Sequence, residues 1–357
     1  SLLTSPDLPG SRVSDHTPTK MADWKIRIDV GGTFSDGWAL TPTAGQIRCK
    51  VLSTGVLRTS IRSVEDGWLV CNRPLSTHVK GLEGFRIGQS VIEDSIPNQG
   101  RLKIMGDFYP GQVIELTTDE DAPVVAARIL TGTAPGEPFP CCELRVATTR
   151  GTNALLEGKG APVDLYTTAG FESLLEVRDQ RSPDLFELSP QIAVPVTRKV
   201  VGISGRFDRD GTELEPLDES VLEGEVPGDA IAIALVNGDC VPTHERRVAE
   251  ILRSKGAEDI SVSSEVAPVI RLWPRMETAV ANAYLTPVMG HFVSGLQASL
   301  PGMPLALMTS AGQLKTAADF RPIDSLLSGP AGGIAGAAAL ARAARLSPIL
   351  TFDMGGT

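Results

Sequence analysis

The chain has 357 residues, of which 42% are hydrophobic, and a net charge of -10. This length and composition fit a folded protein with two domains, whereas scattered Lys and Arg residues exclude the basic surface of a nucleic-acid-binding protein. No apolar run approaches the roughly 20 residues of a membrane span, and five cysteines without C-x-x-C spacing fit neither a disulfide framework nor a zinc site. We therefore expect a cytoplasmic protein without a nucleic-acid or membrane partner.

The N-terminal third is predicted to contain a tail, a group of strands and a β-rich segment. Residues 1–22 are rich in Pro, Ser, Thr and Asp, which predicts a flexible tail. Alternating polar and apolar residues predict three strands, at residues 25–30, 37–40 and 47–52. From about residue 74 to 140, Gly and Pro separate short β-like runs, one of them at residues 124–130. We interpret this segment as a β-rich insertion.

From residue 144 onward, the sequence alternates between strand-like and helix-like segments. Strands are predicted at residues 144–147, 162–167, 230–236, 260–264, 305–308 and 349–353. Helices are predicted at residues 153–159, 243–254, 275–300 and 334–344. This alternation is typical of an α/β fold.

One turn occurs twice. The segment IDVGGT at residues 28–33 recurs as FDMGGT at residues 352–357. Paired glycines after a strand let backbone N–H groups approach a phosphate, and an Asp at the strand end can hold Mg²⁺. A single such turn also fits an ordinary hairpin. Two copies that face each other would instead clamp a nucleotide.

Both turns resemble the two phosphate motifs of the actin, heat-shock ATPase and sugar-kinase superfamily. The resemblance implies an α/β fold of RNase H-like, actin-like ATPase domains, with ATP and Mg²⁺ as cofactors. It makes Asp29 and Asp353 the catalytic and metal-binding carboxylates. The implied phosphate cradle consists of Gly31, Gly32, Thr33, Asp36, Gly355, Gly356 and Thr357.

Three further stretches resemble the hydantoinase A and 5-oxoprolinase family. They are ATTRGTNALLE at residues 147–157, RDQRSPDLF at residues 178–186 and LSGPAGG at residues 327–333. The first departs from the family pattern at Ala147, where Gly is usual. The resemblance implies a substrate-binding set of Thr148, Thr149, Thr152, Asn153, Arg178, Gln180 and Arg181.

Structural alternatives for these stretches stay open. The Thr and Asn side chains of the first stretch could cap the helix that follows, because they accept hydrogen bonds from its first N–H groups. The Arg residues could be solvated loop charges, and residues 329–333 could be a turn packed on an Ala-rich helix. Next to a predicted helix start, His244 and Glu245 are interpreted as surface and capping residues.

The family resemblance also implies a domain order and a reaction. Residues 23–205 would form the family's N-terminal region, with the first RNase H-like half, and residues 206–357 the start of a hydantoinase A domain truncated at its second phosphate motif. The implied enzyme is an ATP-dependent hydrolase that opens a cyclic amide, of the 5-oxoproline or hydantoin type, by phosphoryl activation of the amide oxygen. A hydantoinase B-type subunit or domain would be its partner, and a homo-oligomer is compatible with the sequence. Two alternatives are a small-molecule kinase and a non-catalytic, nucleotide-dependent regulator.

Overall fold

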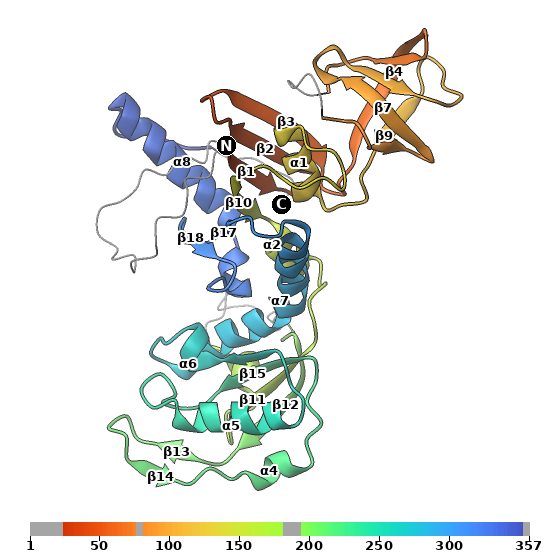
Figure 1. The fold of residues 1–357 in the computed structure, drawn as a ribbon. Helices are drawn as coiled ribbons and strands as arrows, with labels where there is room; N and C mark the ends of the chain where they lie inside the picture. Colours follow the sequence, from red (N-terminus) through yellow and green to blue (C-terminus); the bar gives the residue numbers. More distant parts are fainter. Residues whose placement is uncertain (1–23, 76–80, 181–193, 353–357) are drawn as a thin grey trace, which may run out of the picture. The chain divides into compact units, whose positions relative to one another are not determined.

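The computed structural model describes residues 24–75, 81–180 and 194–352. The expected tail at residues 1–22 lies outside the described residues. The chain divides into two compact units (Figure 1): unit 1 comprises Ser1–Asn153, Phe292–Phe320 and Asp324–Thr357, and unit 2 comprises Ala154–His291 and Arg321–Ile323. The units are interleaved along the sequence, whereas the expected family regions are consecutive. Those family boundaries stay predictions.

Unit 1 contains a central sheet of six strands in the order β18-β17-β10-β1-β2-β3. Its strands are β1 (Trp24–Val30), β2 (Phe34–Leu40), β3 (Gln46–Leu52), β10 (Cys142–Thr148), β17 (Leu305–Met308) and β18 (Leu314–Thr316). β1 forms because Ile26, Ile28 and Val30 alternate toward the core. β1, β2 and β3 are an antiparallel meander, and β10 and β17 extend it parallel to β1. This is the RNase H-like arrangement expected from the sequence.

A second sheet in unit 1 is antiparallel in all its described pairings and has the order β6-β7-β8-β5-β4-β9. Its strands are β4 (Leu57–Glu65), β5 (Trp68–Cys71), β6 (Arg86–Ile87), β7 (Ser90–Ile96), β8 (Arg101–Ile104) and β9 (Val113–Leu116). A short 3-10 helix, η1 (Pro97–Gln99), connects β7 to β8. This β-rich sheet spans residues 57–116, so it begins before residue 74, the expected start of the insertion.

The prediction of a strand at residues 124–130 is wrong, because this segment is helical. It lies in α1 (Ala122–Thr131), which has Pro123 in its first turn and ends at Gly132, in the left-handed conformation. Residues 122–130 are all buried, and the helix packs on β1, β2 and β3. A segment that is buried on every side shows no amphipathic periodicity, so its pattern does not distinguish a helix from a strand.

Two further helices follow motifs found in the sequence. α2 (Arg150–Leu156) begins directly after β10, and α8 (Ser328–Ala344) follows the short 3-10 helix η2 (Pro322–Ser325). The strand expected at residues 349–353 is not formed in residues 349–352. Leu350 and Phe352 are almost fully exposed there. A strand requires a hydrogen-bonded neighbour, and no strand of the described residues pairs with this segment.

Unit 2 contains a four-stranded sheet in the order β12-β11-β15-β16, with all neighbours parallel. Its strands are β11 (Val163–Thr168), β12 (Thr197–Ile203), β15 (Ala230–Ala234) and β16 (Ile260–Val262). β11 and β15 are buried along their whole length, as is typical of parallel strands covered on both faces. The core of the unit forms where α5 (Thr243–Ser254) packs on β15 and β16.

Short helices and strands connect the strands of the unit 2 sheet. They include α3 (Leu174–Val177), β13 (Arg206–Phe207), β14 (Glu213–Glu215), α4 (Ser220–Glu223) and α6 (Ser263–Val266). The helix α7 (Leu272–Ser299) begins in unit 2, and its residues from Phe292 onward belong to unit 1. It contains Pro287 and agrees within three residues at each end with the helix expected at residues 275–300. Within the described parts of the chain, no helix is long and apolar enough to cross a membrane.

Candidate functional site

The parallel strands of the central sheet end at one edge. Val30 of β1 pairs with Thr148 of β10, and Val146 of β10 pairs with Leu307 of β17. The segments after these three strands therefore leave the sheet side by side. Ligands of open α/β sheets bind outside the carboxyl ends of parallel strands. This edge is the candidate ligand site of unit 1.

The first segment at this edge is the glycine turn, residues 31–33. Gly31 donates its N–H to the carbonyl oxygen of Phe34 over 3.0 Å, and a Cβ at Gly31 would lie 2.8 Å from that oxygen. Ser53 holds the turn in place: its Oγ donates to Gly31 O over 2.7 Å and its N–H to Thr33 O over 2.9 Å. Gly32 and Thr33 are exposed. The result is an anchored but accessible backbone loop, as a phosphate cradle requires.

The second segment brings Thr149 and Asn153 against the glycine turn. Thr149 donates its N–H to the Val30 carbonyl oxygen over 2.9 Å, and Asn153 Nδ2 donates to Thr149 Oγ1 over 3.4 Å. A Cβ at Gly32 would lie 3.1 Å from Asn153 Nδ2. Asn153 of the predicted substrate set therefore lies beside Gly32 of the predicted phosphate cradle, although their sequence positions differ by more than a hundred.

The start of α8 lies at the same edge. Ser328, its first residue, is 1% exposed and donates its Oγ to the Thr148 carbonyl oxygen over 3.0 Å. The N–H of Leu327 donates to Thr152 Oγ1 over 3.2 Å. Thr148 Oγ1 accepts the N–H of Arg150 over 3.1 Å, so the capping interpretation holds for Thr148. Thr148 and Thr152 thus connect α2 with α8.

The glycine turn at this edge is open to a ligand, and one polar atom beside it lacks a described partner. Glycines occupy the two positions where a side chain would meet Phe34 O or the Asn153 amide, which keeps the turn open to a ligand. The Oδ1 atom of Asn153 is buried and accepts no hydrogen bond from the described residues. A buried acceptor of this kind requires a partner such as a ligand or an ordered water molecule.

Asp29 and Asp36 lie in one row on the central sheet. Asp29 on β1 pairs with Asp36 on β2, and Asp36 pairs with Lys50 on β3. Directly paired residues project from the same face of a sheet. Lys50 Nζ lies 3.0 Å from Asp36 Oδ1, and both side chains are 56% exposed. The partner of Asp36 in this structure is therefore Lys50, and its contribution to the phosphate cradle stays a prediction.

The remaining predicted site residues are not brought to this edge by any described contact. Asp353, Gly355, Gly356, Thr357 and Arg181 lie outside the described residues. Arg178 and Gln180 lie in unit 2, exposed, with φ angles of 55° and 59°. Among the described residues, no group of three His, Cys, Asp or Glu side chains is arranged to hold a metal ion. The assignment of Mg²⁺ to Asp29 and Asp353 stays a prediction.

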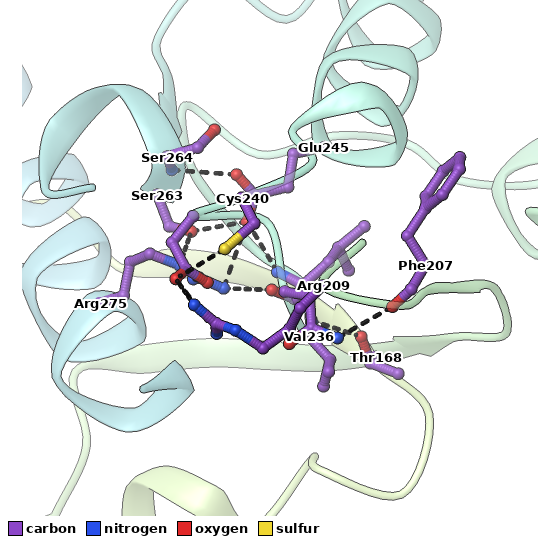
Figure 2. Close-up of polar contacts among 12 residues, drawn as sticks. Thr168, Phe207, Arg209, Val236, Cys240, Glu245, Ser263, Ser264 and Arg275 are labelled. Carbon is purple, nitrogen blue, oxygen red and sulfur yellow. Dashed lines mark hydrogen bonds and ion pairs between the residues drawn. The ribbon is translucent and has the colours of Figure 1, made fainter. Parts of the chain in front are cut away.

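At the carboxyl edge of the unit 2 sheet, Glu245 is the centre of a buried network (Figure 2). Its Oε1 accepts the N–H of Leu235 over 2.8 Å and the Oγ–H of Ser263 over 2.6 Å. Its Oε2 accepts the N–H of Ser264 over 2.9 Å. The expected surface and capping role of Glu245 is wrong, because α5 begins where the segments after β15 and β16 direct their N–H groups at this side chain.

Arg275 of α7 is the cation of this network. It is fully buried, its Nε donates to Ser263 Oγ over 2.8 Å, and its Nη1 donates to Asp239 Oδ1 over 2.7 Å. Burial by itself would raise the pKa of Asp239, but the Arg275 guanidinium and further hydrogen bonds lower this pKa below its usual value. A Cβ at Gly238 would collide with the Glu245 carboxylate. The network therefore fixes the loop that follows β15.

Sequence reasoning missed Ser53 and Ser328 as parts of the unit 1 site. Ser53 lies in the connection between β3 and β4, 22 residues beyond Gly31. No local pattern relates the two residues. Ser328 lies inside the recognised LSGPAGG stretch, but its contact with Thr148 joins positions 180 residues apart. Such contacts depend on tertiary structure. The LSGPAGG stretch is the one local pattern that pointed to either residue.

Comparisons with known proteins connect this architecture to one family. A family model described as the hydantoinase/oxoprolinase N-terminal region matches residues 110–256, and one described as hydantoinase/oxoprolinase matches residues 275–357. Both models belong to the family that the sequence motifs resemble.

Curated relatives carry related names. The chain is 32% identical over 279 residues to 5-oxoprolinase 1 of Arabidopsis thaliana, covering 67% of this chain and 22% of that protein. It is 34% identical over 251 residues to 5-oxoprolinase of Saccharomyces cerevisiae, covering 60% and 20%. It is 33% identical over 247 residues to caprolactamase subunit alpha of Pseudomonas jessenii, covering 63% and 35%. The chain thus spans about a fifth of the length of the two 5-oxoprolinases.

Two solved structures share the fold. The nucleotide-free structure of acetone carboxylase superposes with a TM-score of 0.62 at 16% identity, covering 90% of this chain and 41% of that one. The structure of ATP-dependent caprolactamase from Pseudomonas jessenii superposes with a TM-score of 0.60 at 24% identity, covering 93% and 42%. At these identities the similarity shows the fold alone. It confirms the expected mixed α/β fold of the actin-like ATPase type.

Proposed function

This chain belongs to the hydantoinase/oxoprolinase family, and we propose that it supplies part of the nucleotide site of an ATP-dependent enzyme that opens a cyclic amide. The observation that carries the proposal is the contact between Gly32 of the glycine turn and Asn153 of the family stretch. The names 5-oxoprolinase and caprolactamase among the relatives support a cyclic amide as the substrate. The activity remains a proposal because the chain covers only part of those proteins.

Each residue of the edge has a proposed part in binding. The backbone N–H groups of Gly32 and Thr33 and the Thr33 hydroxyl hold phosphate oxygens, and Asp29 holds the metal side of the nucleotide. Bound ATP with Mg²⁺ would supply the phosphoryl group that activates the amide oxygen. Ser53 keeps the turn in its binding conformation through its two hydrogen bonds. Thr149 and Asn153 present hydroxyl and amide groups next to the turn, where they can orient the reacting groups.

The rest of the predicted site is proposed on the family resemblance. Asp353, Gly355, Gly356 and Thr357 would form the second phosphate turn. Arg178, Gln180 and Arg181 would bind the substrate. The described loop supports this role in one respect: Arg178 and Gln180 have positive φ angles, which cost free energy in residues other than Gly and often occur at functional sites.

A partner and a compartment complete the proposal. One relative is named as an alpha subunit, which supports a hydantoinase B-type partner subunit or domain for this chain. A cytoplasmic location is proposed because the number and spacing of the cysteines do not fit a disulfide framework.

The decisive experiment replaces Asp29 in the full-length enzyme. We expect Asp29→Asn to lower 5-oxoproline-dependent and caprolactam-dependent phosphate release at least about hundredfold, because a charge that faces the nucleotide is lost. The thermal midpoint should change by less than about 2 °C, because Asn keeps the shape of the side chain. Asp66→Asn, in the turn between β4 and β5, is the matched control and should keep full turnover. Full turnover in Asp29→Asn would exclude the proposed role of this carboxylate.

A further inference from the structure

A groove in unit 1 is separate from the glycine turn. Its volume is about 800 Å³, and it is lined by residues of β2, β3 and β4, by residues 72–75 and by Val113 of β9. Small-molecule sites in proteins typically have volumes of about 300–1,000 Å³. None of Gly31, Gly32 and Thr33 lines it. Of the predicted phosphate cradle, only Asp36 lines the groove, so a ligand there would not contact the glycine turn itself.

The lining combines apolar and cationic side chains. Its apolar part includes Phe34, Leu52, Val56, Leu57, Pro74, Leu75 and Val113, and its charged part consists of Arg48, Lys50, Arg58, Arg73 and a single carboxylate, Asp36. Four cations thus face one anion in a chain whose net charge is -10. This local reversal of sign creates a positive potential in the groove, which favours an anionic occupant.

Two of the four cations already have partners. Lys50 Nζ lies 3.0 Å from Asp36 Oδ1, and Arg58 Nε donates to Glu115 Oε1 over 2.8 Å. Arg48 and Arg73 are exposed, and neither forms an ion pair with any residue in the described ranges. The groove therefore offers two guanidinium groups whose charge is not neutralised by a described carboxylate.

We propose that this groove binds a small anionic molecule with an apolar body, whose carboxylate or phosphate head pairs with Arg48 and Arg73. A guanidinium presents its N–H donors in a planar fork that matches the oxygens of a carboxylate or a phosphate. The Phe34 ring and the neighbouring aliphatic side chains provide the apolar contact that removes the body of the ligand from water. The proposal is independent of the amide hydrolase activity. Asp36 of the predicted nucleotide cradle lines the groove, but the proposed contacts with the ligand do not involve it.

The test uses the full chain and a pair of fluorescent probes. The anionic probe is 8-anilinonaphthalene-1-sulfonate, and the neutral probe is N-phenyl-1-naphthylamine, which has the same aromatic body without the charge. In the double variant Arg48→Gln/Arg73→Gln, we expect the dissociation constant of the anionic probe to rise about tenfold, since each ion pair with an exposed arginine contributes modestly. Binding of the neutral probe should not change. Hydrogen exchange should show that the anionic probe protects residues 46–60.

A charge-matched control separates the groove from the general charge of the protein. Arg62 on β4 and Lys103 on β8 are exposed and do not line the groove. Arg62→Gln/Lys103→Gln should therefore keep the affinity for the anionic probe. An equal loss of affinity in both double variants, or no loss in Arg48→Gln/Arg73→Gln, contradicts the proposal.

Competition then identifies the head group. Displacement of the anionic probe by millimolar inorganic phosphate but not by succinate assigns a phosphate head, and the reverse result assigns a carboxylate head. Failure of both anions to displace it contradicts recognition through Arg48 and Arg73. Asp29→Asn should bind the probe like the wild type, so failure of the proposed function and failure of this proposal give different results.

Discussion

The carboxyl edges of the parallel strands differ between the two units in whether their backbone N–H groups are exposed or bound by a buried side chain. In unit 1, Gly32 and Thr33 are exposed after β1, and Ser53 anchors this turn by a hydrogen bond to the Gly31 carbonyl oxygen. In unit 2, the Glu245 carboxylate accepts the backbone N–H groups of Leu235 and Ser264 and is fully buried. N–H groups at such an edge attract an anion. Unit 2 provides that anion from its own sequence, whereas unit 1 leaves the position accessible to a ligand.

This difference separates stability from binding. Burying Glu245 and Arg275 has a desolvation cost, which is compensated only while every hydrogen bond of the network is present. The unit 2 edge is therefore sensitive to any change in its side chains. The turn of residues 31–33 in unit 1 contains no charged side chain, so changes in this turn should alter ligand binding more than stability. Four predictions test this contrast, beginning with the largest expected change in stability.

Removal of Glu245 should have the largest effect. Glu245→Ala leaves Arg275 buried with one carboxylate fewer and leaves two backbone N–H groups without an acceptor. We expect a loss of about 3–5 kcal/mol in the free energy of unfolding, measured by chemical denaturation with hydrogen exchange of residues 230–264. Glu250→Ala, on the exposed face of the same helix, should cost less than about 0.5 kcal/mol. Similar values for the two variants would show that the network does not stabilise unit 2.

Gly238→Ala tests the same network from the backbone. The new Cβ would collide with the Glu245 carboxylate, so we expect a cost of about 2 kcal/mol. The effect should be much smaller in the Glu245→Ala background, where the collision is absent, and a double-mutant cycle measures this coupling. Gly224→Ala is the control, because a Cβ there meets no atom within 4 Å. Additive effects of Gly238→Ala and Glu245→Ala would contradict the inferred contact.

Acid should weaken unit 2 through Asp164, a fully buried residue at the start of β11. Burial by itself would raise its pKa, but hydrogen bonds from Arg198 at 2.7 Å and 2.6 Å, and from Gly228 N–H at 2.9 Å, lower the pKa. A carboxyl whose folded pKa is lowered stabilises the fold above its unfolded pKa near 4, and this stability is lost as the pH falls.

The measurement compares unfolding at pH 7 and at pH 3–4. The wild type should lose stability over this range, whereas Asp164→Asn should be less stable at pH 7 but lose less on acidification. Asp229→Asn, on a neighbouring exposed carboxyl, serves as the control and should follow the wild type. An identical pH dependence in Asp164→Asn and the wild type would exclude Asp164 as a source of acid sensitivity.

Much of the fold follows from local patterns in the sequence. β1 was predicted from its alternation, and the bounds of α5 and β17 agree with the segments expected at residues 243–254 and 305–308. The run at residues 124–130 is predicted as a strand because it is a short β-like run in a segment divided by Gly and Pro. Its helical state depends on the packing around it, since residues 122–130 are buried on every side. The segment at residues 349–352 has strand-like composition, but no described strand pairs with it.

The candidate site was predictable only in part. The glycine turn and the TTRGTN stretch each have a recognisable local pattern, and the structure places Gly32 beside Asn153. The hydrogen bonds of Ser53 and Ser328 could not be predicted, because each joins segments that meet only in the folded sheet. Burial of Glu245 was missed for the same reason. A charged residue in the first turn of a helix usually faces solvent, and here the ends of β15 and β16 cover it.

Gly32→Ala should change stability least while affecting binding most. Its Cβ would lie 3.1 Å from Asn153 Nδ2, and a flexible amide can shift by a few tenths of an ångström, so we expect less than about 1 kcal/mol of destabilisation. The same methyl group lies in the turn where phosphate oxygens would approach the backbone. In the full-length enzyme, the dissociation constant for Mg-ATP should therefore rise about tenfold or more, measured by calorimetry. Gly333→Ala, in α8 with no atom within 4 Å of its Cβ, should leave this constant unchanged. Unaltered nucleotide affinity in Gly32→Ala, or a loss of stability as large as that of Glu245→Ala, would contradict the view that unit 1 keeps this edge open for a ligand.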